Sequence, residues 1–290
     1  MCILGSRANR TPNHAFPRKP GSRYSEGMNA SRRELRSFQF SLRSLLLVMV
    51  GLATLLALGV GIERHVMAPA REAKYRHGRM QCFEVVWLAL VNYHDVYRAL
   101  PSMIVTDRDG QELHSWRSGL IHFGTQLGID FVLPNCEVSW RHPNNANLAA
   151  HGNFMYSFSE SGRNVASVNT FVVAVVGEGT VFANPERTPW KDVPSDAILL
   201  IELADSGRHW MEPGDFDIAD LDARIVKGRF GKGLIVCFSD GDVWILSPTT
   251  PVPDLAKFMT ITGAEEYDRD SVLGPYCLAK TGSRGGHILQ

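Results

Sequence analysis

A run of 19 residues without a charged side chain, from residue 44 to residue 62, constrains the architecture of this chain more than any other feature. An α-helix rises ~1.5 Å per residue, so a helical run of this length spans roughly the ~30 Å hydrocarbon layer of a membrane. Its polar side chains are the hydroxyls of Ser44 and Thr54, which can bond to the helix backbone. A buried helix of a soluble protein rarely runs so far without a polar face. We therefore expect a transmembrane helix at residues 44–62.

The charges beside this run predict its orientation. Residues 1–43 carry a net charge of +7 and the rest of the chain carries −7, although the whole chain is neutral. A basic arm can bind nucleic acid, but next to a membrane span it marks the cytoplasmic side. We therefore expect residues 1–43 to form a disordered cytoplasmic tail without a nucleic-acid partner. A compact basic flank opens at Met28, which leaves both Met1 and Met28 as candidates for the true start.

A cleaved signal peptide is the closest alternative to a permanent anchor. The triplet at residues 68–70 has the small-x-small pattern of a cleavage site. However, the polar residues 63–65 separate it from the apolar run, and the run is longer than the usual core of a signal peptide. We expect an uncleaved anchor, with the C-terminal domain outside the cytoplasm.

Residues 63–267 are predicted to form one α+β domain, which begins with a long amphipathic helix at 70–98. The first part of this helix is basic and would emerge from the membrane near the lipid headgroups. The Leu-Pro pair at 100–101 ends it. Its apolar face at helical spacing consists of Met80, Phe83, Trp87, Leu90 and Tyr97.

In the rest of this domain the apolar residues follow the pattern of β-strands. We expect most of these strands to pair in antiparallel fashion. The best hairpin joins 234–238 to 243–246, because Asp240 and Gly241 suit a tight turn. A helix at 253–262 would close the domain at Gly263, and we expect a loose tail at 268–290. Further strands are predicted at 103–106, 111–116, 169–176 and 197–203. Residues 120–165 are polar and irregular and predict no element.

Several short motifs occur in the order typical of one bacterial family. The sequence resembles the pilin-like, type II secretion protein G-like family, domain-of-unknown-function family fifteen-fifty-nine. The resemblance covers roughly residues 70–265. The motifs are REA at 71–73, RMQC at 79–82, LALVNYHD at 88–95, LP at 100–101, DG at 109–110, HSWR at 114–117, FVVAVVGEGT at 171–180, ILLIELADS at 198–206, WMEP at 210–213, FSDGDV at 238–243 and LS at 246–247.

The resemblance implies a pseudopilin-like fold, in which a long N-terminal helix, membrane-embedded at its start, packs on a small β-sheet. It implies a bacterial inner-membrane protein with a structural or assembly role and no established catalysis or cofactor. Its partners would be the lipid bilayer and other envelope proteins, including further copies of itself. The family-motif residues in this chain are Cys82, Asn92, Tyr93, His94, Asp95, Ser115, Trp116, Arg117, Glu202, Asp205, Ser206, Trp210, Glu212, Pro213, Asp240 and Gly241.

Two departures from the family pattern matter for function. Pilin-like members carry a processing site, Gly-Phe-Thr-Leu-x-Glu, at the start of the apolar run. This chain has SFQFSLRS at 37–44 and lacks the glutamate, which puts peptidase processing and filament formation in doubt. Many relatives also have a histidine ten residues before Asp240, where this chain has Phe230. A role that rests on that histidine does not carry over.

An acidic stretch at 201–215 is the richest candidate for chemistry. Its carboxylates could bind a hard cation such as Ca²⁺ or act as an acid-base pair with His209. Their spacing fits no EF-hand loop, so a solvated loop with local ion pairs is the simpler interpretation. An extracytoplasmic ligand- or Ca²⁺-binding module remains an alternative function. The weak candidates for metal ligands are Glu202, Asp205, Glu212 and Asp215.

No enzyme signature stands out elsewhere. His94 and Asp95 are adjacent on a helix and point about 100° apart, so they cannot form a dyad with each other. Ser206 lacks the Gly-x-Ser-x-Gly elbow of hydrolases, and the glycine-rich segment 228–233 lacks the spacing of a phosphate loop. The other histidines, among them His114, have no spacing typical of metal ligands. We expect no enzyme, with an uncharacterised hydrolase as the second alternative.

Four cysteines lie in the expected outer domain and allow three full pairings. An oxidising compartment permits disulfides, and a bridge from Cys82 to Cys136 is one of the possibilities. Cys237 alternates within a strand, which equally suits a core position. The remaining cysteines are Cys2 and Cys277.

Overall fold

The computed structural model describes residues 41–125, 132–157, 167–184, 188–203, 206–228 and 231–281. The expected tail at 1–40, with both candidates for the start, Met1 and Met28, lies outside these residues, as do Asp205 and Phe230. The chain divides into two compact units, Met1–Leu58 and Gly59–Gln290.

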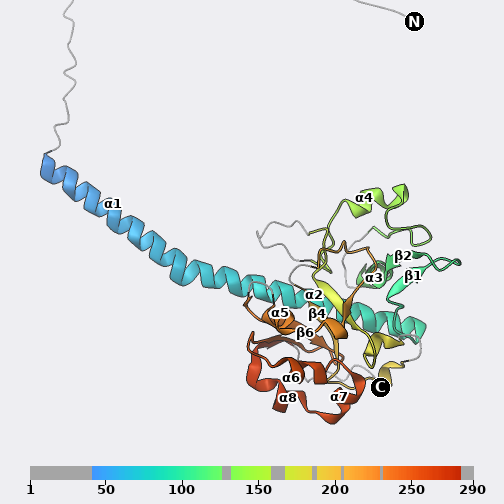
Figure 1. Cartoon of the computed structure of the whole chain (residues 1–290). Coiled ribbons are helices and arrows are strands. Elements are labelled where there is room, and N and C mark those ends of the chain that lie inside the picture. Colours follow the sequence, from blue (N-terminus) through green and yellow to red (C-terminus); the bar gives the residue numbers. More distant parts are fainter. Residues whose placement is uncertain are drawn as a thin grey trace, which may run out of the picture. The chain divides into compact units, whose positions relative to one another are not determined.

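Helix α1 (Leu42–Ile62) contains the expected transmembrane segment (Figure 1). None of its residues is buried, and it carries no acidic residue in its first turn. Within the described residues, one helical stretch, Leu42–Tyr97, is long and apolar enough to cross a membrane. A π-helical turn, η1 (Glu63–Met67), follows α1 along the chain and leads into α2. This pattern is consistent with a single-pass membrane anchor.

Helix α2 (Ala68–Tyr97) confirms the long helix expected at 70–98. Pro69 lies in its first turn, where a missing N–H costs nothing. The helix ends because Arg98 adopts a left-handed conformation with φ of 57°, and its N–H donates to the carbonyl oxygen of His94 at 2.7 Å. The buried face begins at Gly78, so the second half of α2 belongs to the core of the α+β domain.

The main sheet has six strands in the order β5-β3-β4-β6-β7-β8. Every neighbouring pair is antiparallel except β3 and β5, which run parallel. The fold is therefore α+β with a mainly antiparallel sheet, as the sequence predicts. The strands are β3 (Val172–Val176), β4 (Ile198–Glu202), β5 (Phe216–Asp217), β6 (Leu234–Phe238), β7 (Val243–Leu246) and β8 (Cys277–Thr281).

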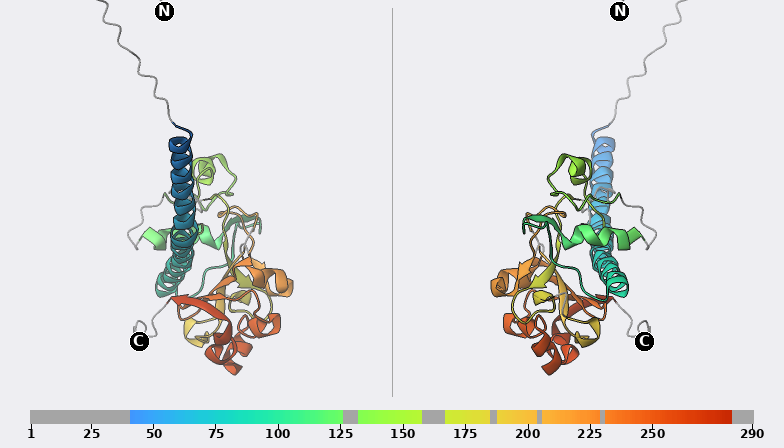
Figure 2. Two further views of the ribbon diagram at one scale, coloured as in Figure 1. Left: turned by 90° about the vertical axis from the view of Figure 1, so that its left-hand side faces the viewer. Right: turned by 90° about the vertical axis from the view of Figure 1, so that its right-hand side faces the viewer.

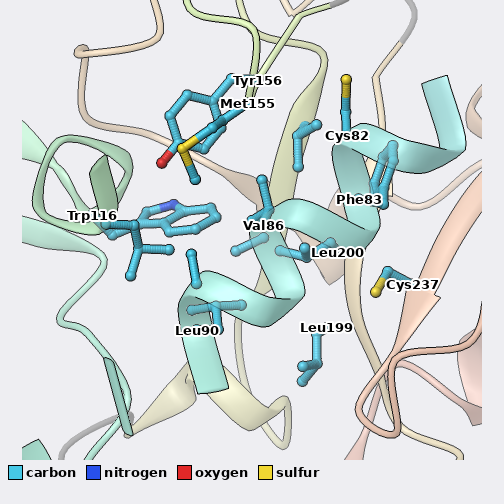
Figure 3. Packing of buried hydrophobic residues seen from close by; sticks show 14 of the residues in the cluster. Cys82, Phe83, Val86, Leu90, Trp116, Met155, Tyr156, Leu199, Leu200 and Cys237 are labelled. Carbon is cyan, nitrogen blue, oxygen red and sulfur yellow. The ribbon is translucent and has the colours of Figure 1, made fainter. Parts of the chain in front are cut away.

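One face of the sheet packs against α2 and α3 (Trp116–Thr125). Figure 3 shows Phe83, Val86 and Leu90 of α2 in one buried cluster with Leu199 and Leu200 of β4. These two adjacent leucines share one hydrophobic cluster, and the pairing of β4 with β6 is irregular between Ile198 and Leu200. A bulge of this kind lets neighbouring residues break the strict alternation of a strand.

The opposite face of the sheet is covered by short helices, so the sheet lies between two helical layers (Figure 2). Alternate residues such as Val236 and Trp244 point to this second layer, while Ile235 and Val243 point to α2. Coverage on both sides explains why the central strands are apolar at every position. The second layer contains α5 (Ala223–Lys227), α6 (Val252–Lys257) and α8 (Arg269–Val272). The apolar residues of α7 (Ile261–Glu266), Ile261 and Ala264, belong to the cluster on the α2 side.

A two-stranded ribbon and a peripheral segment complete the domain. The ribbon pairs β1 (Ile104–Thr106) with β2 (Glu112–Ser115), close to the strands predicted there. The second strand ends at Ser115, and α3 begins at Trp116 and runs into the region at 120–165 that the sequence left unassigned. Helix α4 (Ala146–Ala149) is a single short turn in the same region. Short 3-10 turns lie at Pro143–Asn145, Val181–Ala183, Trp190–Asp192, Ile218–Asp220 and Gly274–Tyr276.

The structure corrects two expectations near the C-terminus. The helix expected at 253–262 is divided into α6 and α7, because the Thr260 side chain caps α7 by accepting from the N–H of Gly263. Gly263 therefore lies inside α7 and does not stop a helix. A side chain there would approach the carbonyl oxygen of Lys257 to 2.0 Å. The loose tail expected at 268–290 is wrong for 268–281, which form α8 and the edge strand β8.

Candidate functional site

The side chain of Arg117 joins two polar motifs that lie far apart in the sequence. Arg117 is fully buried in the first turn of α3, and its Nη1 donates to Oδ1 of Asp215 at 2.8 Å. Its Nε donates to the carbonyl oxygen of Trp210 at 3.1 Å. Its Nη2 donates to the carbonyl oxygens of Glu212 and Gly214 at 3.1 and 2.9 Å. The guanidinium thus fixes the loop that leads into β5.

Asp215 completes this polar cluster from the other side. Its carboxylate accepts from Nε1 of Trp116, at 3.0 Å to each oxygen, and from the backbone N–H of Ala174 in β3 at 2.9 Å. The hydroxyl of Tyr156 donates to the carbonyl oxygen of Arg117 at 2.7 Å, and burial raises the pKa of Tyr156. A buried ion pair with this many partners is suited to fixing a loop, because its charges are compensated and shielded from solvent.

A second buried ion pair joins α2 to β4. Arg79 Nε donates to Oε1 of Glu202 at 2.7 Å, and its Nη2 bonds to the other carboxylate oxygen. Cys82 lies one turn further along α2, and its thiol contacts the carbonyl oxygen of Phe154 at 3.4 Å. Burial, with the negative charge of Glu202, raises the pKa of Cys82 to about 12. The thiol is therefore protonated at neutral pH and is a poor nucleophile.

The tight turn between β6 and β7 packs against α2. Trp87 Nε1 donates to the carbonyl oxygen of Ser239 at 2.8 Å. Gly241 has a φ of 90°, and a side chain there would meet the Trp87 ring at 2.9 Å. The turn therefore requires glycine for its conformation and for this close approach.

Arg269 holds the same turn from the second helical layer. Its Nη2 lies 2.5 Å from Oδ2 of Asp240 and 2.8 Å from Oδ2 of Asp242, and its Nε lies 3.3 Å from Oδ1 of Asp196. The guanidinium also stacks over the Phe238 ring at 4.5 Å. Arg269 is fully buried. Three carboxylates and an aromatic face thus compensate its desolvation.

The polar residues at 92–95 do not form a catalytic group. The His94 ring packs against Trp190 with centroids 5.9 Å apart, and Asp95 is exposed. Asn92 and Tyr93 are half-buried. His94 and Asp95 therefore point to different surroundings, in agreement with their helical geometry.

The serines among the motif residues have structural partners. Ser206 Oγ donates to the carbonyl oxygen of Thr170. Ser115 Oγ accepts from the backbone N–H of Arg117 at 3.2 Å. Neither is paired with a histidine. Asp205, beside Ser206, lies outside the described residues.

The described carboxylates of the acidic stretch are not gathered as metal ligands. Glu202 and Asp215 are each paired with a different arginine. Glu212 accepts from Arg141 Nη2 at 3.4 Å and from the backbone N–H of His209 at 3.2 Å. Among the residues that the structure describes, no group of three or more His, Cys, Asp or Glu side chains is placed to hold a metal ion.

The cysteines are not bridged in the described part of the chain. The possible bridge between Cys82 and Cys136 is absent, because both are free thiols. Cys237 lies in the core of the sheet, as its alternation in the strand predicts. Cys277 is also free.

Comparison with known proteins gives no relative for this chain. No protein-family model matches it, and neither the curated proteins nor the solved structures contain a match.

Sequence reasoning missed the buried Arg269 and the pairing of Arg79 with Glu202. Arg269 belongs to a segment without an apolar pattern, and a buried arginine leaves no periodic signal. The pairing of Arg79 with Glu202 joins positions 123 residues apart. A charge on an otherwise apolar strand was the available signal for Glu202, because such a residue needs a partner when it is buried.

Proposed function

We propose that this chain is a single-pass membrane protein of pseudopilin-like architecture, with a structural or assembly role through protein–protein contacts. The α1 helix would anchor it in a bacterial inner membrane, with the N-terminus in the cytoplasm. The α+β domain would lie outside the cytoplasm, available to other envelope proteins and to further copies of itself.

The observation that carries this proposal is the use of the motif polar residues inside the domain. Arg117 with Asp215 and Arg79 with Glu202 are buried pairs that join helices to the sheet and its loops. Groups that bind or transform a substrate have to reach it, whereas these are shielded from solvent. Their role is to hold a rigid domain together, which favours a scaffold over an enzyme.

The α2 helix offers one surface for such contacts. Val96 and Tyr97 near its end are 61% and 59% exposed, and Leu88 is 38% exposed. Interfaces are enriched in aromatic residues, and the removal of apolar side chains from water is favourable. We expect protein contacts to involve this part of α2.

The two alternatives from the sequence gain no support from the described residues. A cation module would need several free carboxylates in one place, and Glu202 and Asp215 are already paired with arginines. A hydrolase would need an activated nucleophile. The Cys82 thiol is protonated and the described serine Ser206 bonds to the backbone.

The test is photo-cross-linking of the full chain in intact cells, with a photoreactive residue at position 88, 96 or 97. A matched control carries the same residue at Lys191, on the exposed turn Trp190–Asp192. Reproducible adducts with envelope proteins or with the chain itself, from α2 positions and not from the control, support the assembly role. Recovery of the chain as a monomer, with no adduct from position 88, 96 or 97, would overturn it.

A further inference from the structure

The chain leaves the expected membrane span through a helical segment that has no buried residue. This segment comprises η1 and the first part of α2, residues 63–77, and we call it the stalk. The buried face of α2 begins only at Gly78, and Figure 1 shows the start of α2 projecting beyond the sheet. A short helix without packed contacts is marginally stable in water. Contacts outside the domain can therefore decide how well the stalk is ordered.

The stalk carries an excess of positive charge. It contains four cations and two carboxylates, a net charge of +2 with its histidines neutral. Both carboxylates already have partners, and Glu63 pairs with Arg71 inside the stalk. Glu72 pairs with Lys232 at 2.6 Å, which brings one more cation to the stalk from the segment before β6. The positive charge is therefore not neutralised by these pairs.

Three cations of the stalk have no carboxylate within ion-pair distance among the residues that the structure describes: Arg64, Lys74 and Arg76. Arg64 and Lys74 are exposed, and Arg76 is half-buried. The next cation along the helix, Arg79, differs, because it is buried and paired with Glu202. The stalk thus presents its uncompensated charge to the surroundings and not to the core.

The position of the stalk in the sequence brings these charges close to one membrane surface. Arg64 follows Ile62, the last residue of α1, by two positions, and Arg76 follows it by fourteen. At ~1.5 Å per residue these separations are at most about 3 Å and about 21 Å. The headgroups extend roughly 5–8 Å beyond the hydrocarbon layer, and their charge acts over a further ~8 Å at physiological salt. Helical side chains tilt toward the N-terminus, so those of Lys74 and Arg76 reach back toward this range.

Two exposed apolar side chains accompany the cations. Val66 and Met67, in the η1 turn, are 58% and 48% exposed. Helices that lie at a membrane surface combine basic residues with apolar side chains, which enter the boundary between headgroups and acyl chains. The composition of the stalk therefore fits a lipid surface better than the surface of a hydrophilic protein.

We propose that the stalk binds the anionic phospholipid headgroups of the membrane that holds α1. Arg64, Lys74 and Arg76 contact the phosphates, while Val66 and Met67 enter the layer below them. The charge of the stalk is opposite to that of the headgroups, and the stalk follows the span directly along the chain. The inference rests on the membrane anchor of the proposed function and does not depend on the assembly role.

The test is hydrogen exchange of the full chain in vesicles of phosphatidylcholine alone and of an equal mixture of phosphatidylcholine and phosphatidylglycerol. The stalk amides should gain about tenfold or more in protection in the anionic vesicles, because each bound cation stabilises the helix on the surface. Amides of β6 and β7 should not change. The gain should vanish in about 1 M salt, where the Debye length falls to ~3 Å. Equal protection of the stalk in the two kinds of vesicle would overturn the proposal.

Two variants that remove the same number of charges assign the effect. The stalk variant carries three substitutions: Arg64→Gln, Lys74→Gln and Arg76→Gln. The control variant replaces three exposed cations elsewhere on the domain: Arg108→Gln, Lys191→Gln and Lys280→Gln. The gain in protection should be lost in the stalk variant and retained in the control. A gain that persists in the stalk variant, or one that disappears in both, would contradict the assignment to these residues.

Flotation separates a failure of this proposal from a failure of the anchor. The full chain and both variants should float with neutral vesicles, because α1 needs no anionic lipid. A chain that does not float refutes the anchor and the headgroup surface together, whereas a chain that floats with an unprotected stalk refutes the headgroup surface alone. Protection that appears in vesicles of native membrane, but not with purified anionic lipid, would assign the stalk to a protein partner and overturn the proposal.

Discussion

Arg117 and Asp215 are 98 residues apart in the sequence and form an ion pair with 0% and 2% of their side chains exposed. The pair joins α3 to the loop before β5 and, through the N–H of Ala174, to the edge of β3. It therefore connects the helical layer, the loop and the sheet at one point. A satisfied buried polar network of this kind makes the surrounding structure rigid.

Replacing Arg117 with alanine should destabilise the domain strongly. Asp215 would keep a buried charge without its partner, which typically costs about 3–5 kcal/mol. Urea unfolding of the full chain in detergent measures the change in the free energy of unfolding. The control Arg141→Ala removes an exposed ion pair with Glu212, at 3.4 Å, and should cost at most about 1 kcal/mol. Equal effects of the two substitutions would refute the structural role of Arg117.

Arg269→Ala should release the C-terminal edge of the sheet. The substitution removes the cation that compensates Asp240 and Asp242, and we expect a loss of about 3 kcal/mol. Hydrogen exchange should increase most in β8, which follows α8 along the chain. Arg224→Ala is the matched control, because Arg224 pairs with Asp222 at the surface. If β8 kept its protection in Arg269→Ala, the segment would not depend on this residue.

The stability of the domain should fall as the pH drops below about 6.5, the ordinary histidine pKa. Burial lowers the pKa values of His114 and His209, so the folded state binds fewer protons than the unfolded state. The free energy of unfolding therefore rises with pH through this window and levels off above it. Urea unfolding between pH 5 and pH 8 measures it, and His114→Gln should reduce the slope. A slope of the opposite sign would contradict the burial of these rings.

The cysteines should differ in reactivity in the folded chain. Burial raises the pKa of Cys82 to about 12, and Cys237 is fully buried with its pKa also raised. Both should resist iodoacetamide at pH 8 until the domain unfolds, whereas the half-buried Cys136 and Cys277 should react first. Peptide mass spectrometry assigns the labelled sites. Rapid labelling of Cys82 in the folded chain would be the contrary result.

The sequence predicts the elements that depend on local pattern. The apolar run of α1, the 3.6-residue period of α2 and the hairpin around Asp240 and Gly241 are all confirmed within a few residues. Residues that are close together in the sequence determine each of these elements, so the sequence pattern alone predicts them. The expected strand at 111–116 ends one residue early, at Ser115, and the helix α3 that begins at Trp116 was not predicted.

The parts that escaped prediction depend on contacts between distant residues. Residues 268–281 look like a tail in the sequence, and they are ordered by Arg269 and by the pairing of β8 with β7. The parallel strand β5 is two residues long and owes its place to Asp215 and β3. In the candidate site, the sequence named Glu202 and Asp215 as weak candidates for metal ligands, with local ion pairs as the simpler interpretation. Their true partners, Arg79 and Arg117, appear only in three dimensions.

The decisive measurement is the membrane topology of the chain. Cells producing the full chain are converted to spheroplasts, treated with a protease that cannot cross the inner membrane, and extracted with alkaline carbonate. The account predicts that the α+β domain is digested from outside and that a fragment containing residues 42–62 stays in the carbonate-resistant membrane. A domain that is protected until the cells are lysed, or a chain that carbonate releases into solution, would contradict the account.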